Sequence, residues 1–191
     1  MRRARRGTVV VIGDSIPRGY KVGPHEDYPS QLVRHELRPG YEVVNLAVPG
    51  SYGPQTGFDL RPDHPPAVAA LVQTGLNGIL LHGTYNDPDQ NDVHDMLVAT
   101  VDALRAVGVE LVFVAKIPPF GVAGDQGLRT AINTLIDGDQ CGATAVWDPA
   151  DDAYLANPAN AVDLVHWDAE GHRRAAALVA AVMRPFLYGA A

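Results

Sequence analysis

Short apolar runs alternate along this chain with segments that carry helical spacing. Five runs are rich in Val, Ile and Leu with little polar alternation, as expected of strands covered on both faces: 8–12, 41–47, 78–81, 109–115 and 143–147. Between them, apolar residues recur every three to four positions, which predicts helices at 28–37, 66–74, 92–107, 128–136 and 168–186. The pattern therefore predicts a three-layer α/β domain built on a parallel sheet.

Two of these helices show a clear inward-facing stripe. The helix that begins near Asp92 ends at Gly108, and its stripe is Val93, Met96, Leu97, Thr100, Val101 and Leu104. In the last helix the inward positions are Leu178, Val179, Val182, Met183 and Phe186. In such sheets reactive groups gather outside the carboxyl ends of the strands. Four candidate residues follow predicted strands there: Ser15, Gly50, Asn86 and Lys116.

Length and composition bound the class of protein. With 191 residues, 47% hydrophobic and 19% charged, residues 1–191 are most simply a single globular domain. The net charge is −7 although four arginines lie within the first six residues, so the rest of the chain is more acidic still. Such a surface disfavours nucleic acid and anionic lipid as partners. Residues 1–7 are expected to be a flexible basic tail.

Cysteine usage and hydropathy indicate a cytoplasmic protein. Cys141 is the only cysteine, so the chain forms no internal disulfide, and no basic neighbour lowers its pKa. We expect an inert, apolar side chain there. No stretch approaches the length of a membrane span, and Gly13-Asp14-Ser15 interrupts the first apolar run where a signal peptide would need its cleavage site.

Three residues are candidates for nucleophilic catalysis. Ser15 stands at the tip of the first predicted strand, and Asp163 and His166 are three positions apart, so one turn can present both on the same side. A serine becomes a useful nucleophile when a base takes its proton and a carboxylate orients that base. The alternative for Ser15 is an ordinary serine that caps a helix. Asp168 and His172 are spaced four apart, which predicts a surface ion pair and leaves His166 as the base.

Metal and phosphate sites find little support in the sequence. Asp87-x-Asp89-x-Asn91 imitates the start of a calcium loop, but Asp92 and Val98 stand where Gly and Glu are required. The histidines show no ligand spacing, and no glycine-rich phosphate cradle occurs. We therefore expect neither a metal nor a nucleotide cofactor.

Four blocks in this order resemble the SGNH (GDSL-like) hydrolase family: Gly13-Asp14-Ser15, then 45–50, then Asn86-Asp87, and last Asp163-Leu164-Val165-His166 with Gly171 beyond it. The resemblance implies a flavodoxin-like α/β/α sandwich of five parallel strands in the order 2-1-3-4-5, with no metal or organic cofactor. It also implies a Ser15–His166–Asp163 triad. The oxyanion hole would then consist of the backbone N–H groups of Ser15 and Gly50 and the side-chain amide of Asn86.

The third block departs from the family pattern. Its usual form is Gly-x-Asn-Asp, whereas this chain reads Gly83-Thr84-Tyr85-Asn86-Asp87, so Thr84 occupies the usual glycine position. A catalytically silent binding module of the same fold is therefore an alternative. A receiver-like phospho-acceptor domain, using Asp14 and Lys116, is a second alternative, but the chain lacks an acceptor aspartate at the required spacing from that lysine.

The expected substrate is a small ester or acylated molecule. The candidate substrate-binding residues form a mixed apolar and aromatic set on the predicted loops: Tyr52, Tyr85, Phe120, Val165 and Trp167, with Pro88 beside them. They favour an acyl or aryl ester of modest size, cleaved by a serine esterase. An acyltransferase or a deacetylase would use the same machinery. The sequence makes no prediction of the oligomeric state.

Overall fold

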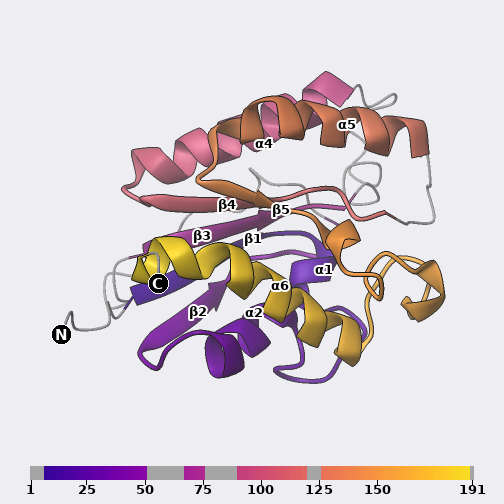
Figure 1. Ribbon diagram of the computed structural model, residues 1–191, viewed down its shortest axis with the longest axis horizontal. Coiled ribbons are helices and arrows are strands. Elements are labelled where there is room, and N and C mark those ends of the chain that lie inside the picture. The colour runs from indigo at the N-terminus through magenta and orange to yellow at the C-terminus, as the bar shows by residue number, and fades with distance from the viewer. Residues whose placement is uncertain (1–6, 51–66, 76–89, 120–125, 190–191) are drawn as a thin grey trace.

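A five-stranded parallel sheet organises the molecule. The computed structural model describes residues 7–50, 67–75, 90–119 and 126–189. The strands follow the order β2-β1-β3-β4-β5, and every neighbouring pair is parallel (Figure 1). This order is the one that the resemblance implies. The strands are β1 (Gly7–Gly13), β2 (Tyr41–Asn45), β3 (Ala67–Gln73), β4 (Leu111–Ala115) and β5 (Ala145–Trp147).

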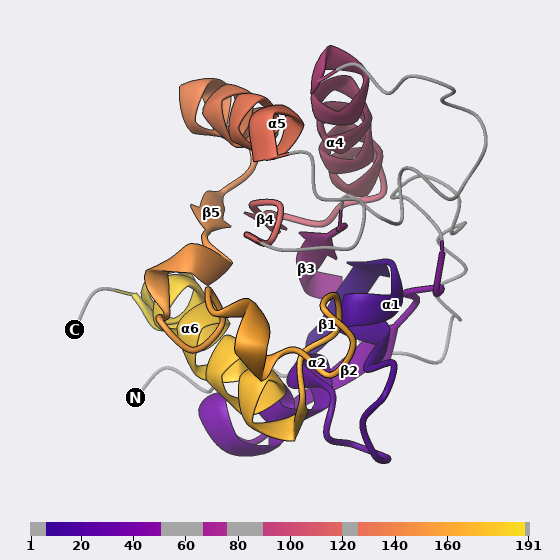
Figure 2. The same ribbon diagram turned by 90° about the vertical axis from the view of Figure 1, so that its right-hand side faces the viewer.

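Helices cover both faces of the sheet. Seen along the strands, α4 (Gln90–Ala106) and α5 (Gln126–Asp139) lie on one side, while α2 (Tyr28–Gln31) and α6 (Ala169–Tyr188) lie on the other (Figure 2). A π-helical turn, η1 (Leu32–Glu36), extends α2. The shorter elements are α1 (Ser15–Arg18) and the 3-10 turns η3 (Gln140–Gly142), η4 (Pro149–Asp151) and η5 (Pro158–Asn160). The predicted three-layer architecture is confirmed.

One predicted helix is a strand. The segment predicted as a helix at 66–74 contains β3, which pairs with β1 on one side and with β4 on the other. The run Ala67–Gln73 is short and almost wholly apolar, and periodicity alone does not separate a buried strand from a buried helix in such a run. The ladders satisfy its backbone groups, and its side chains alternate between the two cores. The predicted strand at 78–81 lies outside the described residues.

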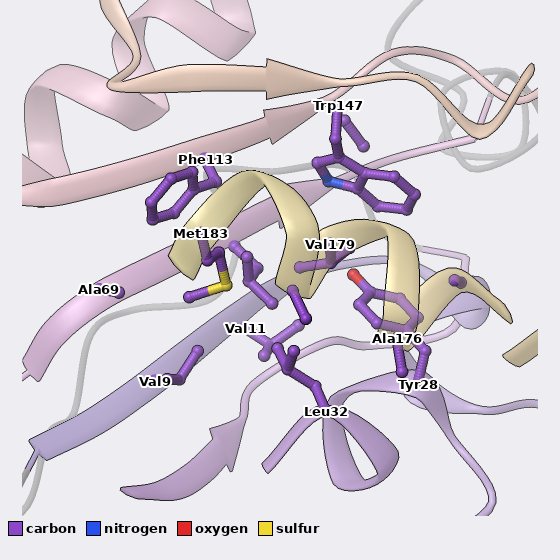
Figure 3. Packing of buried hydrophobic residues seen from close by; sticks show 14 of the residues in the cluster. Val9, Val11, Tyr28, Leu32, Ala69, Phe113, Trp147, Ala176, Val179 and Met183 are labelled. Carbon is purple, nitrogen blue, oxygen red and sulfur yellow. The ribbon is translucent and has the colours of Figure 1, made fainter. Parts of the chain in front are cut away.

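Alternate residues of each strand enter opposite cores. Val9 and Val11 of β1 face α2 and α6, where Tyr28, Trp147 and Met183 close the first core (Figure 3). Val10 and Ile12 enter the second core, against α4 and α5. The whole predicted stripe of α4 is buried: Val93, Met96, Leu97, Thr100, Val101 and Leu104. Burial on both faces explains why the strands read as apolar runs rather than as alternating patterns.

The predicted inward face of the last helix is partly wrong. Val179 and Met183 are fully buried, and Leu178 and Val182 are half-buried against the first core. Phe186 is 47% exposed, although its ring meets the edge of Phe113 at a centroid distance of 5.7 Å. It lies in the last turn of α6, where fewer neighbours remain to cover it. Among the described segments, no helix has the length and apolar character needed to cross a membrane.

Candidate active site

The first motif forms a tight turn at the carboxyl end of β1. Gly13 has φ 154°, and a Cβ atom there would lie 1.8 Å from the Gln73 carbonyl oxygen, so only glycine fits between β1 and β3. Asp14 caps α1: its Oδ1 accepts from Ile16 N–H at 2.9 Å, and its Oδ2 accepts from Gly75 N–H at 2.6 Å. Because Asp14 supplies the cap, the hydroxyl of Ser15 is not needed for capping.

Asp14 is buried beneath this turn. Burial raises the pKa of its carboxyl, although the backbone hydrogen bonds from Ile16 and Gly75 and the nearby His166 oppose that shift. The carboxylate of Asp14 joins the turn that carries Ser15 to the segment that follows β3. Asp14 therefore holds Ser15 in place and does not lie between Ser15 and a base.

Ser15, His166 and Asp163 form a continuous hydrogen-bonded chain. Ser15 Oγ lies 2.7 Å from His166 Nε2, and His166 Nδ1 lies 2.9 Å from both carboxylate oxygens of Asp163. Partial burial alone would raise the pKa of Asp163, but hydrogen bonds from the ring and the backbone N–H of His166 outweigh it and lower that pKa. With a carboxylate at Nδ1, the imidazole keeps a lone pair at Nε2 that can accept the serine proton.

The turn that carries Asp163 and His166 is closed by its own backbone. Asp163 Oδ1 accepts from His166 N–H at 3.0 Å, and Val162 N–H donates to His166 O at 2.8 Å. Leu164 adopts a left-handed conformation with φ 68°, which lets the chain reverse direction between the acid and the base. The contacts within this turn therefore bring Asp163 and His166 together.

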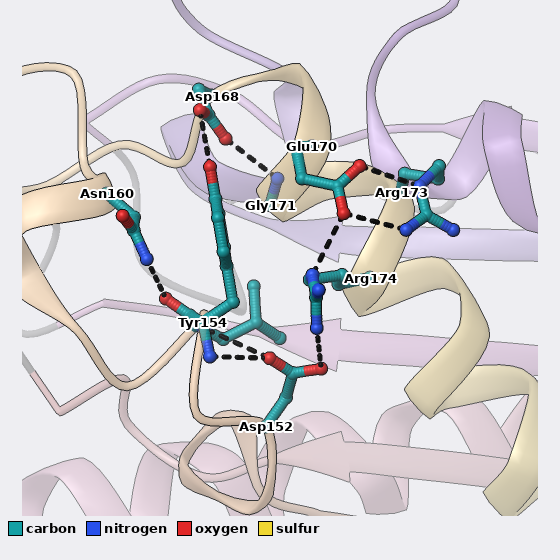
Figure 4. A network of polar contacts seen from close by, with 9 residues as sticks. Asp152, Tyr154, Asn160, Asp168, Glu170, Gly171, Arg173 and Arg174 are labelled. Atoms are coloured by element: carbon teal, nitrogen blue, oxygen red, sulfur yellow. Dashed lines mark hydrogen bonds and ion pairs between the residues drawn. The ribbon is translucent and has the colours of Figure 1, made fainter.

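A polar network fastens the segment before this turn to α6 (Figure 4). Tyr154 Oη donates to Asp168 Oδ2 at 2.8 Å, and Asp168 caps α6 by accepting from Gly171 N–H at 2.8 Å. Arg174 contacts Asp152 at 3.3 Å and Glu170 at 2.9 Å. The loop between β5 and α6 is thus anchored on both sides of Asp163 and His166.

The predicted surface ion pair of Asp168 and His172 is wrong. His172 is fully buried, and its Nδ1 accepts a hydrogen bond from Tyr28 N–H at 3.2 Å. Burial lowers the pKa of His172 to about 4, against the effects of Asp27 and Asp168. The four-residue spacing places His172 on the face of α6 that packs against α2, so the imidazole serves the core.

The structure describes only some of the candidate oxyanion and substrate-binding residues. Val48 N–H donates to Gly13 O at 2.9 Å, which ties the segment after β2, two residues before Gly50, to the end of β1. Gly50 has φ 79°, and no atom lies within 4 Å of the position of a Cβ. Val165 is half-buried. Five further candidates lie outside the described residues: Tyr52, Tyr85, Asn86, Pro88 and Phe120.

The prediction that Trp167 contacts substrate is wrong. Its side chain is only 1% exposed and packs against the rings of Tyr28 and His172. Trp167 directly follows His166, but an antiparallel bridge with Ala161 turns it into the core. Its position next to His166 in the sequence therefore did not indicate the direction of this side chain.

Tyr20 is a site residue that the sequence did not reveal. Its ring centroid lies 4.9 Å from that of His166, and its N–H donates to Ser15 O at 3.0 Å. The side chain is 46% exposed. An aromatic residue five positions after Ser15 was the available signal.

Two other groups play no part at this site. Lys116 is held by Asp137 at 2.7 Å and Asp148 at 3.1 Å, so it is not free for the receiver-like role. Within the described ranges, one group could offer three metal ligands: His94, Asp139 and Cys141. A hydrogen bond of 2.9 Å already joins His94 to Asp139, and burial raises the pKa of the Cys141 thiol to about 12. Cys141 is the buried, inert side chain that was expected.

The fold and the site together define a class of protein. A doubly covered parallel sheet that presents a serine, a histidine and an aspartate at its carboxyl edge is the arrangement of SGNH-type carboxylic ester hydrolases. The sequence profile of the GDSL-like Lipase/Acylhydrolase family matches residues 11–174. The chain belongs to this family. No curated protein is significantly similar to it in sequence.

Solved structures of similar fold extend over nearly the whole chain. A protein from Desulfitobacterium hafniense assigned to the G-D-S-L lipolytic family is 19% identical, with a TM-score of 0.70 over 92% of this chain and 98% of that one. A carbohydrate esterase family 2 enzyme with a carbohydrate-binding domain, from Myceliophthora fergusii, is 16% identical, with a TM-score of 0.72 over 98% of this chain and 68% of that one. A GDSL-like lipase from Bacteroides thetaiotaomicron is 15% identical, with a TM-score of 0.67 over 95% and 89%. At these identities the likeness concerns the fold.

Proposed function

We propose that the protein is a serine esterase that cleaves small carboxylic esters through an acyl-enzyme on Ser15. The observation that carries this proposal is the unbroken chain of contacts from Ser15 Oγ through His166 to Asp163, with distances of 2.7 and 2.9 Å. The arrangement joins a nucleophile to a base and the base to an orienting carboxylate. A catalytically silent module would have no need for that geometry.

In the proposed reaction Ser15 Oγ attacks the ester carbonyl while its proton moves to His166 Nε2. The tetrahedral intermediate collapses, the bond between the carbonyl carbon and the alcohol oxygen breaks, and His166 returns the proton to the leaving alcohol. Water then attacks the acyl-enzyme by the same steps and releases the acid. Asp163 stays ionised throughout and stabilises the imidazolium; its lowered pKa suits that role. An alcohol in place of water would make the reaction an acyl transfer.

The proposed oxyanion hole consists of the N–H groups of Ser15 and Gly50 and the amide of Asn86. Ser15 begins α1, so its N–H has no acceptor within that helix. The bare backbone of Gly50 suits a close approach of the oxyanion. The role of Asn86 rests on the family resemblance.

Replacing Asn86 by alanine should lower kcat by about 10²–10³ with little change in KM, as measured with a chromogenic ester. An unchanged kcat accompanied by a lower melting temperature would instead mean that Asn86 is a turn residue.

Covalent labelling tests the proposal directly. A fluorophosphonate should form one adduct, on Ser15, because only an activated hydroxyl reacts readily at such phosphorus centres. Peptide mass spectrometry locates the adduct, and Ser15→Ala serves as the negative control. His166→Ala should abolish labelling while the fold, checked by circular dichroism, is retained. Failure of the folded protein to react, or reaction elsewhere, would favour the silent module.

A further inference from the structure

Three exposed apolar residues lie close to His166, either in sequence or in contact with it. Tyr20, Val162 and Leu164 are 46, 54 and 59% exposed. All three lie on the two segments that carry Ser15 and His166. Single exposed apolar residues are ordinary, but a group of them around a reactive centre indicates a contact with something outside the chain.

Backbone hydrogen bonds place two of these residues next to Ser15 and His166. Tyr20 N–H donates to Ser15 O at 3.0 Å, and its ring lies 4.9 Å from the imidazole. Val162 N–H donates to His166 O at 2.8 Å. The Tyr20 ring therefore lies against the imidazole, and the backbone of Val162 is bonded to that of His166.

Leu164 is unexpected at its position. Its φ of 68° is a left-handed conformation that glycine and asparagine adopt readily and leucine does not. Its side chain gains little from burial, because most of it is exposed. Neither the local backbone nor the core explains a leucine here, and a backbone outlier of this kind points to a functional contact.

The position of His166 in the proposed reaction indicates which part of the substrate lies there. His166 Nε2 must hand its proton to the oxygen of the leaving alcohol, so that oxygen lies within hydrogen-bond distance of Nε2. The group attached to this oxygen then emerges beside the residues that flank His166. The acyl chain, in contrast, is attached to the carbonyl carbon over Ser15.

We propose that Tyr20, Val162 and Leu164 form an apolar rim that binds the alcohol moiety of the ester, and that the preferred substrates are short-acyl esters of apolar alcohols. The inference rests on the proposed esterase function for the direction in which the alcohol leaves. It makes Leu164 a specificity-determining residue for the leaving group.

The test varies the two halves of the ester separately. Hexyl acetate, methyl acetate and methyl hexanoate are compared by kcat/KM in the unmodified protein, in Leu164→Asn and in Val107→Asn. Asparagine suits the left-handed backbone, so Leu164→Asn should keep its melting temperature. Val107 is 56% exposed in the turn between α4 and β4, which lies at the opposite end of the strands from Ser15. It is therefore a matched control.

We expect the unmodified protein to prefer hexyl acetate over methyl acetate. Leu164→Asn should lower that ratio about tenfold, because it removes the apolar contact of one side chain with the alcohol. Val107→Asn should not change the ratio. The ratio of methyl hexanoate to methyl acetate should stay constant in both variants. An effect of Leu164→Asn on the acyl series alone, or no effect on either ratio, overturns the proposal.

A binding measurement separates this inference from the proposed function. In NMR titrations 1-hexanol should shift the ring resonances of His166 in the unmodified protein and in Val107→Asn, but much less in Leu164→Asn. Such shifts without any ester hydrolysis would refute the esterase and keep the apolar site. Ester hydrolysis without these shifts would support the esterase and refute the apolar site. Binding to phosphatidylcholine vesicles that is lost in Leu164→Asn, with unchanged ester ratios, would assign the rim to a lipid surface and overturn the proposal.

Discussion

Two carboxylates close to Ser15 differ in their surroundings. Asp14 is buried, and burial raises its pKa, whereas hydrogen bonds and charge from His166 lower the pKa of the more exposed Asp163. Only Asp163 touches the imidazole, through both carboxylate oxygens. At the scale of residues, contact geometry separates the two carboxylates: Asp14 holds the turn, and in the proposed mechanism Asp163 orients the imidazole of His166.

Replacing Asp163 by asparagine should lower kcat by about 10³–10⁴ while the fold is retained. Asparagine keeps an oxygen that can accept from the N–H of His166, but it removes the negative charge and permits the wrong imidazole tautomer. Steady-state kinetics with a chromogenic ester measures the loss, and circular dichroism checks the fold. A kcat within tenfold of the parent would show that Asp163 has only a structural role.

The elements around the site depend on close packing between α6 and the loop before it. In α6, a Cβ atom at Gly171 would lie 2.8 Å from Trp167 Cβ, inside van der Waals contact. In α5, a Cβ atom at Gly138 would meet nothing within 4 Å. Helix propensity favours alanine at both positions, so packing alone decides the sign of the effect on stability.

Gly171→Ala should lower the free energy of unfolding by about 1–3 kcal/mol, and Gly138→Ala should raise it by about 0.5–1 kcal/mol. Urea unfolding of both variants measures these two changes in the free energy of unfolding. Because Trp167 follows His166 directly, Gly171→Ala should also lower kcat, and Gly138→Ala should not. Equal changes in stability would mean that Trp167 relaxes without strain.

The Tyr154 hydroxyl is the link between the β5–α6 loop and the cap of α6. Tyr154→Phe removes its hydrogen bond to Asp168 and should lower the melting temperature. Thermal unfolding measures this loss, with Tyr20→Phe as a control for removal of a hydroxyl elsewhere. A shift no larger than that of the control would show that the contact with Asp168 adds nothing.

At the scale of the whole molecule, His172 couples folding to pH. Its pKa is about 4 in the folded chain, below the ordinary value of 6.5, because the imidazole is buried. The unfolded chain therefore binds this proton more readily between pH 6.5 and 4. The contribution to stability is fully present above pH 6.5 and is lost as the pH falls toward 4, by about 3 kcal/mol in total.

His172→Asn should flatten this part of the stability profile. Asparagine can accept the hydrogen bond from Tyr28 N–H without titrating. Urea unfolding between pH 7 and 4 should show a smaller loss of stability in His172→Asn than in the parent protein. His35→Asn, at an exposed position, should follow the parent profile. Parallel profiles for all three proteins would contradict the assignment of this pH dependence to His172.

The sequence by itself determined much of this protein. Apolar runs predicted four of the five strands, and helical spacing predicted α4, α5 and α6. The pairing of Ser15 with Asp163 and His166 was expected from two short blocks. These features are local, or are read from residue types that a reaction demands. The roles assigned to the three residues stay a proposal.

Tertiary structure decided the rest. The segment 67–73 became a strand because two neighbouring strands pair with it, and its own apolar run was compatible with either form. His172 and Trp167 turned into the core because α6 packs against α2 and a bridge redirects the chain after His166. Tyr20 reached the imidazole because residues 146 positions apart in sequence meet at one edge of the sheet. The direction of a side chain depends on which elements surround it, and local sequence does not contain that information.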